Sequence, residues 1–231
     1  IEILKGLDYS PLYVSLKTGI VATIFSFFLG LFAARKVIKA GPKVKAIADG
    51  ILTLPMVLPP TAAGFFLLLL FSRRRPFGIL LYEEFGIKVV QTWAGCIIAA
   101  TVIAFPLMYR NARAAFEQVD INLIHAGQTL GMSDSPDLLA GSRCLTAGPG
   151  IASGTVLAFA RAIGEYGATS MLAGNILGKT RTVSVAIASE TAAGNYGTAG
   201  FWVVVIVLIS FVIVALINIV SGRGMKTRRW I

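Results

Sequence analysis

The sequence lacks the residues and motifs that most enzyme chemistry needs. It has one histidine, His125, two cysteines and only 14% charged residues. It contains neither a His-Glu-x-x-His metal motif nor the Gly-x-x-x-x-Gly-Lys-Ser/Thr loop that holds nucleotide phosphates. Because His125 lies in a polar stretch, no nucleophile–histidine pair can form within the apolar segments. We therefore predict a chain with no catalytic or metal site. Any process that needs energy must then draw it from another subunit or from an ion gradient.

The scarcity of charge also excludes an ordinary soluble domain, in which about a quarter of the residues are charged. Hydrophobic residues make up 56% of the chain, and the mean hydropathy is +0.78. The formal net charge of +10 would suggest nucleic-acid binding in a soluble protein. Here the lysines and arginines cluster at the ends of apolar runs, which is typical of membrane proteins. We predict an all-α polytopic membrane protein that binds no nucleic acid, with Cys96 and Cys144 as free thiols.

Five apolar segments are long enough to cross a bilayer. Basic residues follow the first and fifth of them, and Arg110 and Arg113 mark the end of the third, so we expect the N-terminus outside and the C-terminus in the cytoplasm. The run Arg73–Arg75 departs from this trend. Residues 182–192 are too short to span and predict a short helix near the outer interface, a sixth span being the alternative. The predicted spans cover about residues 12–34, 47–71, 94–116, 150–172 and 200–220.

The second predicted span contains three prolines. Proline removes an amide donor and clashes with the preceding turn, so this span should be kinked or broken near mid-depth. The freed carbonyls then need protein or water partners, which favours a place inside the bundle. The kink either lines a path or serves packing alone. The residues of this candidate pore segment are Thr53, Pro55, Pro59, Pro60 and Thr61, with Thr101 as a further hydroxyl that would bind an anion weakly.

Two opposite charges fall inside the fourth predicted span. Arg161 and Glu165 are four residues apart and would share one helix face. Each charge at the bilayer centre costs roughly 2.5 to 3.5 kcal/mol on insertion scales. The pair either lines a polar path or subunit interface, or neutralises itself and locks the bundle. We expect it to shape the interior of the protein.

The polar loop between the third and fourth spans, residues 117–149, is too long for a simple turn. Within it, residues 120–131 resemble a helix, with Asp120 as N-cap and Gly131 at the left-handed C-terminal position. Ile121, Ile124 and Leu130 contribute to a modest apolar face. A short amphipathic helix outside the lipid needs a surface to lie on, supplied either by the protein's own spans or by a partner.

Residues 125–131, His-Ala-Gly-Gln-Thr-Leu-Gly, followed by Gly148-Pro-Gly150, resemble the "EAA" loop of the membrane subunits of ABC importers. Ala126 and Gly131 match that motif, whereas Gly127 replaces an alanine and His125 replaces the glutamate. The resemblance implies a cytoplasmic coupling helix that docks on an ATPase subunit. The implied docking residues are Ile121, Ile124, His125, Ala126, Gly127, Leu130 and Gly131.

Within this family the chain is similar to molybdate permease subunits, through residues 15–17, 54–60, 105–108, 158–168 and 178–182. The resemblance implies one type I importer transmembrane domain over residues 1–231, in the prokaryotic plasma (inner) membrane. It also implies a second copy of the chain, two ABC ATPase subunits that carry ATP and Mg, and an extracytoplasmic molybdate-binding protein. Tungstate is a close chemical analogue. A sulfate/thiosulfate ABC permease is the alternative, and an ATP-independent secondary transporter or channel is a further one that leaves the long loop unexplained.

Residues 136–145 depart from the family pattern, being about one residue too long and lacking its aromatic residues. We hypothesise a local frame slip in the sequence or a diverged gene, which resequencing of these codons decides. If the residues are genuine, docking on the ATPase loses an aromatic anchor, which typically costs about 2 kcal/mol or more.

Overall fold

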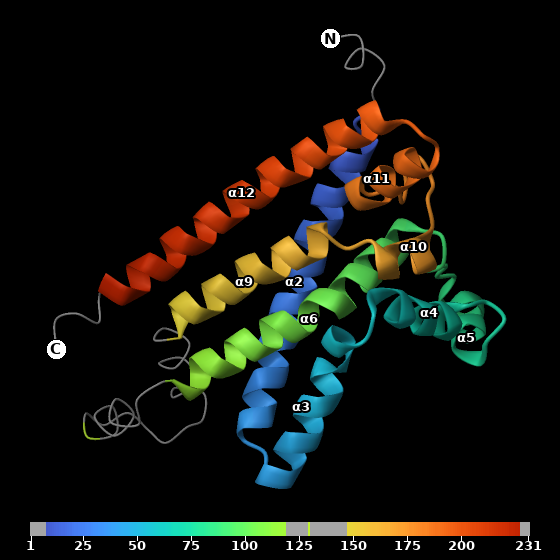
Figure 1. The fold of residues 1–231 in the computed structure, drawn as a ribbon. Helices are drawn as coiled ribbons and strands as arrows, with labels where there is room; N and C mark the ends of the chain where they lie inside the picture. The colour runs from blue at the N-terminus through green and yellow to red at the C-terminus, as the bar shows by residue number, and fades with distance from the viewer. Residues whose placement is uncertain (1–7, 119–128, 130–146, 227–231) are drawn as a thin grey trace.

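The computed structural model describes residues 8–118, 129 and 147–226, and the side chains up to residue 215. Helices connected by short segments make up the described ranges, and no strand occurs within them (Figure 1). The helices are α2 (Ser10–Ile38), α3 (Pro42–Val57), α4 (Pro60–Phe71), α5 (Pro76–Phe85), α6 (Trp93–Glu117), α9 (Gly148–Ile163), α10 (Gly167–Ala173), α11 (Val183–Ala192) and α12 (Tyr196–Lys226).

Three of the described helices are long and apolar enough to cross a membrane, namely α2, α6 and α12 over Tyr196–Ala215. The pair α3 and α4 passes the same test as one bent unit, which makes up to four. The short helix expected over residues 182–192 is confirmed as α11, where Thr182 accepts a hydrogen bond from the Val185 amide at 3.4 Å. Helix α5 lies between the second and third predicted spans, and the apolar pattern of the sequence does not predict it.

The fourth predicted span, residues 150–172, differs from the single helix that we expected. It consists of α9, with 16 residues, and α10, with 7, separated by Gly164, Glu165 and Tyr166. Sixteen helical residues rise roughly 24 Å, which is less than the hydrocarbon core of about 30 Å. Helix α9 alone is therefore too short to cross the core, and the span test does not select it.

Small residues let the central helices approach closely. Helix α2 packs along α6 and α9, and α6 packs on α9, while α12 contacts α9 and α11 (Figure 1). A Cβ atom placed on Gly30 would lie 2.8 Å from Cγ of Met108, and one on Gly19 would lie 2.7 Å from Cγ1 of Ile163. Such contacts are typical of helix packing in membranes, where shape complementarity replaces the hydrophobic effect. The alanines of this core are Ala22, Ala34, Ala100, Ala104, Ala112, Ala115, Ala147, Ala158 and Ala162.

Candidate functional site: two broken helices and a charged network

The first break separates α3 from α4, whose axes differ by 107°. Leu58 is extended, with ψ 143°, because a residue before proline is disfavoured in the helical region. Pro60 then occupies the first turn of α4, where its missing N–H costs nothing. The prolines were expected to break the helix, and the bend lies at Pro59 and Pro60. Pro55, in contrast, is accommodated inside α3.

The second break lies between α9 and α10 and is built around a buried carboxylate. Glu165 is 2% exposed and follows the end of α9 by two residues. One of its oxygens accepts a hydrogen bond from the Ala168 amide at 2.8 Å, so it satisfies a free N–H in the first turn of α10. The other oxygen lies 2.8 Å from Nη1 of Arg161, whose side chain is 34% exposed. The predicted pair therefore forms, but Glu165 stands outside the helix that carries Arg161.

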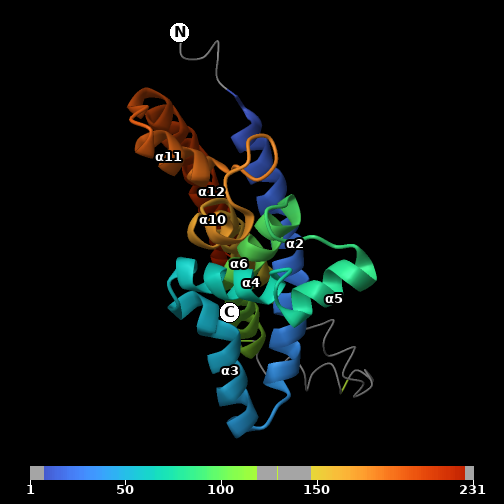
Figure 2. The same cartoon turned by 90° about the vertical axis from the view of Figure 1, so that its right-hand side faces the viewer.

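The two breaks are in contact with each other. A Cβ atom on Gly167 would lie 2.9 Å from Cβ of Pro60 and 3.0 Å from the Thr61 amide nitrogen. One on Gly64 would lie 2.6 Å from Cα of Ala168. Figure 2 shows α10 directly against α4, in agreement with their contacts. The first turns of α4 and α10 thus meet where two chain segments are interrupted, an arrangement found at the substrate sites of many transporters.

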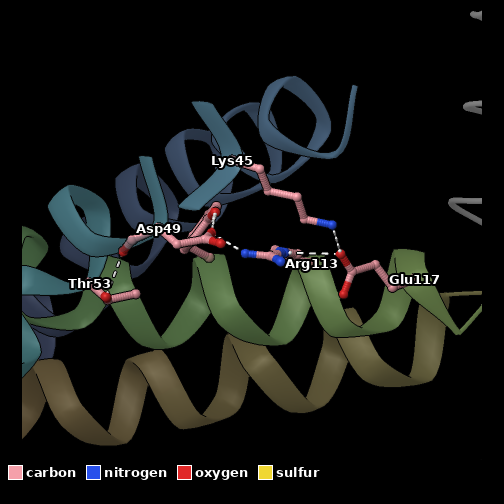
Figure 3. Close-up of polar contacts among 6 residues, drawn as sticks. Lys45, Asp49, Thr53, Arg113 and Glu117 are labelled. Atoms are coloured by element: carbon pink, nitrogen blue, oxygen red, sulfur yellow. Dashed lines mark hydrogen bonds and ion pairs between the residues drawn. The ribbon is translucent and has the colours of Figure 1, made fainter. Parts of the chain in front are cut away.

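A network of charges joins α3 to α6 away from the breaks (Figure 3). Arg113 pairs with Asp49 and, at 3.1 Å, with Glu117, and Lys45 lies 2.6 Å from Glu117. The Tyr109 hydroxyl also donates to Asp49. The side chains of the four charged residues are 21% to 40% exposed. Their formal charges cancel, so the network neutralises itself while it fastens two helices together.

A cavity of about 390 Å³ lies beside this network. Thr53 lines it, and the Thr53 hydroxyl donates to the Asp49 carbonyl at 2.6 Å, within its own helix. Arg110 also lines the cavity, and its guanidinium lies 3.9 Å from the Met56 sulfur. The sequence showed Arg110 and Arg113 only as markers of a cytoplasmic end. The network itself was missed, because no local pattern pairs Arg113 with Asp49.

The three threonines suggested as weak anion ligands lie in different surroundings. Thr53 faces the cavity at the charged network, and Thr61 is exposed in the first turn of α4, beside the breaks. Thr101 is 9% exposed in α6, and its carbonyl accepts a hydrogen bond from Ser26 at 3.3 Å. The structure therefore brings only Thr61 together with the two breaks. The anion-binding role of all three stays a prediction.

Several predicted sites lie outside the described residues. They include the coupling-helix positions Ile121, Ile124, His125, Ala126, Gly127, Leu130 and Gly131, Cys144, and the divergent stretch 136–145. Cys96 is a free, buried thiol, as expected. No group of histidine, cysteine, aspartate and glutamate side chains suited to a metal ion occurs in the ranges that the structure covers.

Comparison with known proteins identifies the family of this chain. The model of the binding-protein-dependent transport system inner membrane component matches residues 26–223. The molybdenum transport system permease protein ModB of Escherichia coli strain K12 is 40% identical over 208 residues, covering 89% of this chain and 90% of its own. The putative molybdenum transport system permease protein YvgM of Bacillus subtilis is 37% identical, covering 91% and 92%. The sulfate transport system permease protein CysT of Salmonella typhimurium is 30% identical, covering 91% of this chain and 75% of its own.

Solved structures agree on the fold. An inward-facing structure of the MetNI methionine ABC transporter superposes with a TM-score of 0.69 at 16% identity, over 95% of this chain and 99% of that one. An amino acid ABC transporter gives a TM-score of 0.64 at 15% identity, over 96% and 99%. The expected all-helical importer fold is confirmed. Because a family model matches most of its length and a relative is 40% identical over nine tenths of both chains, this chain belongs to the inner membrane components of binding-protein-dependent transport systems.

Proposed function

We propose that this chain is the membrane-spanning subunit of an ATP-driven importer of molybdate. The observation that carries the proposal is the 40% identity to a molybdenum permease over nine tenths of both chains. A sulfate permease is more distant, at 30% identity over three quarters of its own length. Tungstate has the same charge and shape as molybdate, and we expect it to be carried as well.

We propose that two copies of the chain assemble with two ATPase subunits, which bind ATP and Mg, and with an extracytoplasmic oxyanion-binding protein. The N-terminus lies outside and the C-terminus in the cytoplasm. In this orientation α6 descends to the cytoplasmic face and leads directly into loop 117–149. That loop would dock on the ATPase and pass its movement to α6 and, through Arg113 and Asp49, to α3.

The broken helices suit the transport of an anion that must not be held tightly. The first turns of α4 and α10 meet at Pro60 and Gly167. The amides of Ala62, Ala63 and Ala168 already donate to Pro59 and Glu165, so the amides of Thr61 and Gly167 are the donors that these turns offer to an anion. The buried Glu165 already neutralises Arg161, so this pair offers no uncompensated cation that would trap a dianion. Amides and the Thr61 hydroxyl are weak ligands, which permit release.

Reconstituted complexes test this proposal directly. ATP hydrolysis should be stimulated by binding protein loaded with molybdate or tungstate, and much less by binding protein exposed to sulfate. Equal stimulation by sulfate would favour sulfate as the transported anion. Sulfate is the second candidate, which the relationship to CysT supports. Oxyanion uptake by the chain without any nucleotide-hydrolysing subunit would overturn the importer proposal itself.

A further inference from the structure

A basic cavity of about 450 Å³ opens at the end of the molecule where α2 and α6 begin. None of the residues that line it belongs to the two breaks or to the charged network. Three lysines line it from three separate elements: Lys17 from α2, Lys88 from the segment before α6, and Lys179 from the loop before α11. None of the described residues that line it is acidic, so their formal charges sum to three positive charges.

Aromatic side chains fix one of these lysines in place. The Lys17 ammonium lies 3.9 Å from the Trp93 ring centroid and 5.8 Å from that of Tyr13. The Trp93 indole N–H in turn donates to the buried Thr18 hydroxyl at 3.0 Å, which holds the ring. A cation over an aromatic face keeps N–H donors free to bind an anion.

The carboxylates nearest in sequence to Lys17 and Lys179 are engaged elsewhere. Glu190 pairs with Arg181 at 2.6 Å, and Asp8 accepts hydrogen bonds from Ser10 at 2.6 and 2.9 Å. Within the ranges that the structure describes, no ion pair involves Lys17, Lys88 or Lys179. The described residues therefore offer the cavity no internal counter-charge, and an anionic ligand would supply it.

The cavity is continuous with an exposed apolar face of α2. Tyr13, Ile20, Ile24 and Phe28 are 65%, 51%, 49% and 65% exposed, and Lys17 stands in the same row. These residues are spaced by three or four and so share one side of the helix. From Tyr13 to Phe28 the helix rises roughly 22 Å, more than the depth of one leaflet. Tyrosine and tryptophan at the top of such a face mark the level of lipid headgroups.

We propose that this cavity binds the phosphate of an anionic glycerophospholipid, whose acyl chains lie along the exposed face of α2. The same lysines would attract a free oxyanion, but such an ion would not cover the apolar face beneath them. An acidic side chain of a partner protein would likewise leave that face without an occupant. The combination of three ammonium groups, two interfacial aromatic rings and an apolar row is what selects a lipid.

Native mass spectrometry of the delipidated, assembled transporter tests this site. Phosphatidylglycerol should give a saturable adduct on this subunit, and zwitterionic phosphatidylcholine should bind much more weakly. The triple variant Lys17→Gln, Lys88→Gln, Lys179→Gln should weaken phosphatidylglycerol binding by on the order of a hundredfold, at about fivefold for each lysine near an anionic headgroup. The matched control Arg73→Gln, Arg74→Gln, Arg75→Gln removes three exposed charges outside the cavity and should leave binding unchanged.

Each other result overturns the lipid assignment. Equal binding in the lysine and arginine variants would place the lipid elsewhere, and equal binding of both lipids would exclude charge recognition. Displacement of phosphatidylglycerol by millimolar inorganic phosphate or molybdate would show that the cavity binds free oxyanions. Displacement by the binding protein would show that the cavity is a protein-docking site. If the triple variant fails to assemble, Lys88→Gln alone, outside any helix, should still weaken binding about fivefold.

Discussion

Gly167 of α10 lies so close to Pro60 of α4 that a Cβ atom on the glycine would come within 2.9 Å of the proline Cβ. No change of rotamer can move either Cβ atom, because the added one would be bonded directly to the backbone of α10 and the other belongs to a proline ring. The position is occupied by the residue that lacks a side chain, and this allows the two interrupted segments to touch. The contact exists only in conformational states in which α4 and α10 are adjacent, as they are in this structure. A change at this contact therefore alters the population of that state.

Gly167→Ala should therefore disfavour this state. Overpacking typically costs about 1 to 3 kcal/mol, which shifts a two-state equilibrium about 5- to 150-fold. We expect slower molybdate uptake into proteoliposomes and a lower melting temperature in detergent. Gly50→Ala is the matched control, because a Cβ atom there meets nothing within 4 Å and alanine favours the helix. Wild-type uptake and melting temperature in the Gly167 variant would contradict the contact.

Removal of Arg161 should destabilise the protein because it leaves the Glu165 carboxylate buried without its cation. Breaking a buried ion pair lowers the free energy of unfolding by about 3 to 5 kcal/mol. Because Arg161 is partly exposed, we expect a loss at or below the low end of that range. We expect Arg161→Ala to lower the melting temperature in detergent more than the double variant Arg161→Ala, Glu165→Gln does. In the double variant the neutral amide oxygen still accepts from Ala168. A double variant less stable than Arg161→Ala alone would refute this reading of the pair.

A structural feature could be predicted from the sequence when residues close together in the chain determine it. The bend between α3 and α4 follows from the chemistry of Pro59 and Pro60 and their immediate neighbours, so it was predictable. The break after α9 depends on a side chain, Glu165, capping the following helix, and on the contact of Gly167 with Pro60. An apolar pattern over residues 150–172 carries no sign of either, which explains the expectation of one continuous helix.

The charged network was beyond sequence reasoning for a related reason. Tyr109 and Asp49 are 60 residues apart in the chain, and only the packing of α6 on α3 brings them together. A weak signal existed, since Asp49 falls inside an apolar segment and Arg113 inside another. Charges that enter two spans often meet each other. The importer family, in contrast, was predictable from motifs spread along most of the chain.

Glu190 should contribute to a pH dependence of stability. Hydrogen bonds from Asn195 at 2.9 Å and Arg181 at 2.6 Å, with the arginine charge, hold the pKa of this carboxyl below its ordinary value. A lowered folded-state pKa gives stability that is present above the unfolded pKa and is lost as the pH falls through the folded value. Between about pH 6 and pH 3 the wild-type melting temperature should therefore fall more than that of Glu190→Gln. Glu83→Gln, which removes an exposed carboxylate from α5, should retain the wild-type slope. Parallel curves for Glu190→Gln and wild type would exclude the contribution.

The ion pairs between α3 and α6 should affect transport more than folding. Asp49→Asn with Lys45→Gln removes the pairs that Arg113 and Glu117 make across these helices, while the Arg113–Glu117 pair within α6 remains. Partly exposed pairs are each worth about 0 to 1 kcal/mol, so the loss of stability should stay below about 2 kcal/mol. On our proposal α6 transmits the movement of the ATPase to α3, and the double variant should transport several-fold less oxyanion for each ATP hydrolysed.

The matched control for this double variant is Lys43→Gln with Glu83→Gln, which removes one charge of each sign from exposed positions outside the network. It should preserve both the transport ratio and the melting temperature. An unchanged ratio in the network variant would mean that α3 follows α6 through apolar packing alone. A large fall in melting temperature with an unchanged ratio would make the network a structural clamp, because a coupling element must alter transport at a given ATPase rate.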